Sequence, residues 1–142
     1  LMKSLLLPLL AALALPTAVN AGEKFDITCF WNLEDAKPDA SEAIDRFVID
    51  TDLDKGSLIA YEKPPNGKNK LSDKYMVTYI NSPSQIEVII DLGYDLGTSI
   101  IFDKKNVEKP KVTDLVKEYG QWNESTLQTK YKYFNCRKTF FN

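Results

Sequence analysis

Three aspartates alternate with other residues in the stretch DTDLDKGSLIAYE, which begins at Asp50, and this spacing is close to that of a calcium-binding loop. In an EF-hand loop, acidic ligands occupy positions 1, 3 and 5, glycine occupies position 6 and a bidentate glutamate occupies position 12. The first three positions match Asp50, Asp52 and Asp54, but Gly56 and Glu62 each come one residue late. The flanking residues alternate as strands do. The stretch therefore favours a β-hairpin with an acidic face, and its three aspartates are weak candidates for a hydrated calcium contact.

The sequence contains no histidine, which narrows the catalytic chemistry open to it. Ser-His-Asp and Cys-His catalysis need an imidazole base, and most catalytic zinc sites need imidazole ligands. No catalytic motif takes their place, so we expect no cofactor and regard an enzyme as the least favoured class. A carboxylate-dependent hydrolase would need residues such as Glu87, Asp91, Asp95 or Asp103 to lie within about 5–10 Å of one another in a cleft.

The first 21 residues have the pattern of a cleaved secretory signal peptide. Lys3 precedes an apolar run, Pro16 ends that run, and the sequence VNA places small residues before a cleavage site after Ala21. The mature chain, residues 22–142, has the length of one domain. No second hydrophobic segment follows, so we expect no membrane attachment after cleavage. The protein is mildly acidic, with a net charge of −2, and its basic residues are scattered, which argues against nucleic-acid binding.

Both cysteines, Cys29 and Cys136, fall near the ends of the mature chain. An exported protein meets an oxidising compartment, so an even pair of cysteines predicts a disulfide. A redox or nucleophilic thiol is the alternative, but the sequence has neither a C-x-x-C motif nor a histidine base.

Apolar and polar residues alternate with a period of two in several short segments, which is typical of strands with one buried face. The first segment places Phe25, Ile27, Cys29 and Trp31 on one face. The other segments are residues 46–53, 57–62, 75–80, 86–92, 98–103 and 127–136. The last of these is expected to place Tyr131 and Tyr133 on one face and Phe134 and Cys136 on the other.

Polar connections separate these strands at residues 32–45 and 63–73. Residues 113–120, with the sequence TDLVKEYG, have a capping threonine and a glycine stop, and they are compatible with one short helix. Six to seven antiparallel strands at this spacing predict a mainly β fold, either a small barrel or a two-layer sheet. The disulfide would tie the N-terminal strand to the C-terminal strand.

The leader KSLLLPLLAALALPTAVNA resembles the leader of many small exported proteins of marine picocyanobacteria. The mature chain is similar in style to several of them, with an early cysteine, a strand of the type FVIDTD, a short meander and a final strand YKYFNC. These proteins are mostly uncharacterised. The resemblance therefore implies export and a β fold but no activity. The expected location is the periplasm or the extracellular space, and in a cyanobacterium the thylakoid lumen is an alternative.

Two tryptophans, seven tyrosines and seven phenylalanines are concentrated on the predicted strands. Five of them could line the mouth of a small barrel: Trp31, Tyr75, Tyr79, Tyr131 and Tyr133. They suggest a monomeric binding or interaction module for an apolar or aromatic small ligand, or for a partner protein. Core packing and cross-strand pairing would use the same residue types. An envelope-associated protein without a pocket is therefore the main alternative.

Overall fold

A computed structural model of the chain describes residues 22–34, 43–62 and 70–138, so the predicted signal peptide lies outside the described residues. The described part contains strands and no helix. Nine strands follow one another along the chain: β1 (Lys24–Leu33), β2 (Ala43–Asp50), β3 (Lys55–Glu62), β4 (Lys70–Asn81), β5 (Gln85–Gly93), β6 (Leu96–Asp103), β7 (Lys111–Glu118), β8 (Gln121–Glu124) and β9 (Tyr131–Lys138).

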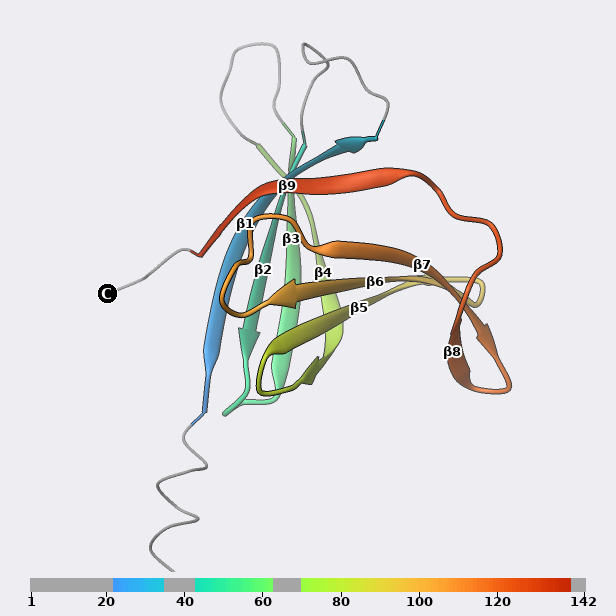
Figure 1. The fold of residues 1–142 in the computed structure, drawn as a ribbon, viewed down its shortest axis with the longest axis horizontal. Helices are drawn as coiled ribbons and strands as arrows, with labels where there is room; N and C mark the ends of the chain where they lie inside the picture. Colours follow the sequence, from blue (N-terminus) through green and yellow to red (C-terminus); the bar gives the residue numbers. More distant parts are fainter. Residues whose placement is uncertain (1–21, 35–42, 63–69, 139–142) are drawn as a thin grey trace, which may run out of the picture.

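All nine strands belong to one antiparallel sheet with the order β8-β7-β6-β5-β4-β3-β2-β1-β9. Consecutive strands from β1 to β8 are neighbours, and β9 returns to pair with the free side of β1. The sheet bends at β4, because the two halves of this strand pair with different neighbours. Residues 70–77 pair with β3, and residues 78–81 pair with β5. This change of partner lets β5, β6 and β7 cross β1 to β4 at a steep angle (Figure 1).

The two sides of the folded sheet are linked by hydrogen bonds at β9. The backbone N–H of Cys136 donates to the carbonyl of Glu108, in the connection between β6 and β7, at 3.1 Å. Nearby, the Lys138 ammonium donates to the carbonyl of Lys104 at 2.8 Å. These contacts hold β9 against the connection between β6 and β7, so the sheet folds back on itself and part of the edge at β9 is covered.

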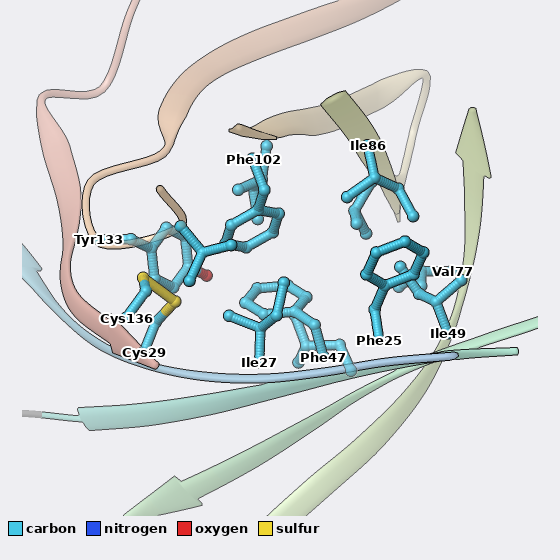
Figure 2. Close-up of a cluster of buried hydrophobic side chains, with 14 of the residues drawn as sticks. Phe25, Ile27, Cys29, Phe47, Ile49, Val77, Ile86, Phe102, Tyr133 and Cys136 are labelled. Carbon is cyan, nitrogen blue, oxygen red and sulfur yellow. A yellow bond between two sulfur atoms is a disulfide. The ribbon is translucent and has the colours of Figure 1, made fainter. Parts of the chain in front are cut away.

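Alternation along the strands produces one apolar core between the two sides of the sheet. Figure 2 shows side chains of β1 and β2 pointing toward those of β5 and β6. The largest side chains that are almost wholly buried are Phe47, Phe102, Ile27, Ile49, Ile86, Ile100 and Val88, and Cys29 lies with them. The predicted mainly β fold and the Cys29–Cys136 disulfide are confirmed.

The prediction of a short helix near residues 113–120 is wrong, because this segment is the end of strand β7 followed by a turn. β-branched residues such as Val112, Thr113 and Val116 favour strands, and β7 hydrogen-bonds to β6 on one side and to β8 on the other. Tyr119 and Gly120 both have positive φ, at 52° and 77°, and form the tight turn of this hairpin. With β7 and β8 included, the described strands number nine rather than six or seven.

The hairpin at DTDLDKGSLIAYE exists, but its turn comes earlier than the sequence pattern predicted. β2 ends at Asp50, whose Oδ1 accepts hydrogen bonds from the N–H groups of Asp52 and Leu53 at 3.0 and 3.2 Å. This local bonding replaces the strand ladder, as aspartate side chains commonly do in turns. A period of two over the predicted strand 46–53 would place Leu53 on the apolar face with Phe47 and Ile49. In the turn it is instead 64% exposed.

Within the described ranges there is no helix long and apolar enough to cross a membrane.

The disulfide joins residues that are 107 positions apart, so it should strongly limit the unfolded chain. Replacing both cysteines, as Cys29→Ala with Cys136→Ala, should lower the free energy of unfolding by about 3–5 kcal/mol. Urea unfolding followed by circular dichroism measures this difference. Dithiothreitol should destabilise the wild-type protein and leave the double variant unchanged; equal stability of the wild type with and without reductant would contradict the bridge.

Candidate binding cleft

A cleft of about 630 Å³ opens at one end of the sheet, where β1, β3 and β5 end and β2, β4 and β6 begin. Clefts of this size in barrel mouths are common ligand sites. Its walls carry mainly apolar and aromatic side chains with a few polar groups. The lining residues are Trp31, Leu33, Ala43, Asp45, Leu58, Ala60, Tyr61, Glu62, Ser72, Tyr75, Ile90, Asp91, Leu92, Thr98, Thr129 and Tyr133.

Asp45 is the most deeply placed charged residue of the cleft, with only 6% of its surface exposed. The Tyr133 hydroxyl donates a hydrogen bond of 2.5 Å to Asp45 Oδ2, and the Trp31 side chain also hydrogen-bonds to this carboxylate. Burial raises the pKa of Asp45, and the two hydrogen bonds oppose that rise because they favour the charged form. The cleft therefore has a carboxylate at its inner end, held by two aromatic side chains.

A β-bulge at Asn135 brings Tyr133 to this carboxylate. The register between β1 and β9 shifts between Thr28 and Phe30, and Asn135 has a φ of 50°. Asparagine tolerates this left-handed conformation better than most residues. The extra residue reverses the alternation of β9, so Tyr133 and Cys136 are both buried. The expectation that they lie on opposite faces is wrong for this reason.

The inner wall of the cleft is apolar, and its rim is more polar. Leu58 and Ile90 are buried, whereas Leu92 at the rim is 62% exposed. Two more carboxylates line the cleft: Glu62 Oε1 accepts from the Ser72 hydroxyl at 3.4 Å, and Asp91 Oδ1 accepts from the N–H of Gly93 at 2.9 Å. The described residues that line the cleft include no lysine or arginine.

Three of the five aromatic residues singled out from the sequence, Trp31, Tyr75 and Tyr133, line this cleft. Tyr79 does not: its hydroxyl donates to Asp54 Oδ1 at 2.9 Å, beside the turn that follows β2. The backbone of Tyr131 pairs with Leu33 in β9, and its side chain lies outside the described part of the chain.

Two of the three aspartates considered for calcium, Asp50 and Asp54, make other contacts with their carboxylates. Asp50 caps its own turn and lies 3.7 Å from the Lys24 ammonium, and Asp54 accepts from Tyr79. Because residues 51–54 form a turn, the three aspartates do not line one extended face as expected. Over the described ranges, no group of three or more carboxylate or cysteine side chains is arranged to hold a metal ion.

The four carboxylates considered for hydrolysis do not meet in this cleft. Only Asp91 lines it. Asp103 pairs with Gln85 at the opposite end of β5, where its Oδ1 accepts from the N–H of Lys105. Asp95 lies in the hairpin turn after β5, and Glu87 lies mid-strand opposite Ile101.

Sequence reasoning missed Asp45, because the polar pattern of residues 32–45 predicts a connection there rather than a strand. The signal that could have identified it is the alternation of buried residues along β2. Asp45 is two residues before Phe47 and four before Ile49, and all three are buried on one face of the strand. Ionised side chains are rarely buried without a partner, so an aspartate in phase with a buried stripe marks a position of interest. Its partners Trp31 and Tyr133 were identified as candidates.

Comparisons with protein-family models, with curated proteins and with solved structures found no match to this chain.

The left-handed conformation of Asn135 makes a prediction for that position. Asn135→Gly should leave stability nearly unchanged, because glycine adopts positive φ freely. Asn135→Val should lower the free energy of unfolding by about 1–2 kcal/mol, since a β-branched residue is strained there. Urea unfolding measures both, with Arg137→Val as the matched control on the same strand. Equal stability of the glycine and valine variants would contradict a bulge at this residue.

The buried carboxylate predicts a pH effect on stability. With its pKa raised by burial, Asp45 holds a proton more tightly in the folded protein than in the unfolded chain, so its favourable contribution is present at low pH and is lost as the pH rises through the folded pKa. Asp45→Asn stays neutral and should lack this loss. The free energy of unfolding of the variant, relative to the wild type, should increase between about pH 3 and pH 7, by at most about 1.4 kcal/mol per pH unit.

Urea unfolding at several pH values measures this difference, and Asp103→Asn, at an exposed position, controls for the loss of one negative charge. A difference between Asp45→Asn and the wild type that stays constant with pH would contradict the expected linkage.

Proposed function

We propose that this chain is an exported binding protein that holds a small, mainly apolar ligand in the cleft at the end of the sheet where β1, β3 and β5 end. The observation that carries the proposal is the cleft itself, about 630 Å³ in volume, with an apolar inner wall and few polar groups. Sites of this kind hold small ligands because apolar burial supplies affinity and the few polar groups fix orientation.

Export is part of the same proposal. Residues 1–21 have the pattern of a signal peptide, and the Cys29–Cys136 disulfide is compatible with an oxidising compartment such as the periplasm or the extracellular space. The likeness of the leader to that of small exported proteins of marine picocyanobacteria supports the same location.

A pocket-free envelope component is the alternative, and the arrangement of Asp45 favours the binding protein. A purely structural end of a barrel would be more stable with an apolar side chain than with a buried carboxylate, which costs free energy unless it is well paired. Retention of a costly group in a cleft is typical of functional sites.

The neutral aromatic probe N-phenyl-1-naphthylamine tests this proposal with the mature protein, residues 22–142. Its fluorescence should rise and saturate at one probe per chain. A dissociation constant on the order of 10–100 μM is expected, from about 0.3–0.4 kcal/mol per non-hydrogen atom. Ala60→Phe, which fills the cleft, should weaken binding about tenfold, the effect of losing roughly 1.4 kcal/mol.

Met76→Phe provides the matched control, because Met76 lies on the neighbouring strand β4, is 73% exposed and does not line the cleft. Thermal unfolding checks that each variant folds, and Ser72→Trp at the exposed rim obstructs the cleft without altering the core. Unchanged probe affinity in both Ala60→Phe and Ser72→Trp, or no saturable binding by the wild type, would overturn the proposal.

A further inference from the structure

We propose that the ligand of this cleft is an organic cation, in which an amine or ammonium group is attached to an apolar or aromatic body. This inference rests on the proposed function and adds the chemical class of the ligand. Its basis is the charge of the cleft, the geometry around Asp45 and the nature of the walls.

The described charges in the cleft are all negative. Asp45, Glu62 and Asp91 line it, and the described lining residues include no basic side chain, although the chain as a whole has 18 lysine and arginine residues against 20 acidic residues. The ion pairs Lys24–Asp50, Arg46–Asp26 and Lys104–Glu23 engage carboxylates outside the cleft. Negative charge in a partly enclosed cleft raises the local concentration of cations and disfavours anions.

Asp45 retains acceptor capacity toward the cleft. An ionised carboxylate offers about four lone-pair sites, and the described hydrogen bonds to Asp45 come from Tyr133 and Trp31. Both donors are neutral, so they orient the carboxylate without neutralising its charge. A ligand cation would supply the positive charge that Tyr133 and Trp31, the described hydrogen-bond donors to Asp45, do not carry. The attraction would be stronger than at the surface because the site is shielded from water.

Aromatic rings surround this carboxylate. Trp31 and Tyr133 touch it, and Tyr75 lines the same cleft. The faces of such rings attract cations within about 6 Å, and the attraction increases when the cation is desolvated. The apolar side chains of Leu58 and Ile90 provide a surface for the hydrocarbon part of the same ligand.

Three probes with the same body and different charge test the inference: 3-phenylpropylammonium, 3-phenylpropanol and 3-phenylpropanoate. Each is titrated against the mature protein carrying N-phenyl-1-naphthylamine at pH 7.5, and displacement is followed by fluorescence. The ammonium should bind about tenfold more tightly than the alcohol, a typical gain for a cation placed against a carboxylate and aromatic rings. The carboxylate probe should bind most weakly.

Asp45→Asn keeps the size of the side chain and removes its charge, so it should bring the ammonium and the alcohol to nearly equal affinity. Asp103→Asn removes one negative charge outside the cleft and should keep the tenfold preference. The comparison among the three probes on the wild type stands by itself if Asp45→Asn does not fold.

The outcomes separate the two proposals. Equal or tighter binding of the alcohol, or of the carboxylate probe, on the wild type overturns the cation preference and leaves the binding function in place. A tenfold ammonium preference that persists in folded Asp45→Asn overturns the assignment to this carboxylate. Failure of N-phenyl-1-naphthylamine and of all three probes to bind overturns both proposals.

Discussion

Phe47 packs edge-to-face against Phe102 at a ring-centroid distance of 5.3 Å and against Tyr133 at 5.6 Å. The three rings come from β2, β6 and β9, which are not neighbours in the sheet order, so this contact joins parts of the sheet that no strand pairing joins. Phe47 is fully buried, and such aromatic clusters contribute both burial and specific ring geometry. The curvature of the sheet and the position of Tyr133 both depend on this cluster.

Tyr133 lies at the boundary between the apolar core and the cleft and contacts both. Its ring belongs to the apolar core, and its hydroxyl donates to Asp45 at the inner end of the cleft. An amphipathic side chain suits this boundary, because its body can be buried while its polar tip meets a partner. The cleft is therefore positioned by the same packing that stabilises the fold, and the bulge at Asn135 sets which residues of β9 take part.

The alternation of Phe25, Ile27 and Cys29, and of Ile86 and Val88, was sufficient to predict a mainly β fold with one core, because a period of two reflects burial directly. Local polar chemistry was harder to predict. The Asp50 side chain ends β2 three residues earlier than the alternation of residues 46–53 predicted. Residues 113–120 have a capping threonine and a glycine as a helix would, but they form a strand that ends in a tight turn at Tyr119.

The cleft was predicted only in part. Their aromatic side chains identified Trp31, Tyr75 and Tyr133 as candidates. The hydrogen bonds to Asp45 could not be predicted in this way, because they depend on which face of β2 carries Asp45 and on a bulge in β9. A single extra residue reverses every side chain beyond it, so alternation alone could not place Tyr133 and Cys136 on one face.

The Cys29–Cys136 bond also determines how mechanical tension would travel through the molecule. Residues 30–135 lie between the two sulfur atoms along the chain, so a pull applied through Gly22 and Lys138 would pass across the bridge and leave that loop unloaded. Only the short segments outside the cysteines would extend, and they belong to the end of β1 and of β9 remote from the cleft. Under oxidising conditions the cleft is therefore isolated from forces that act on the ends of the described chain.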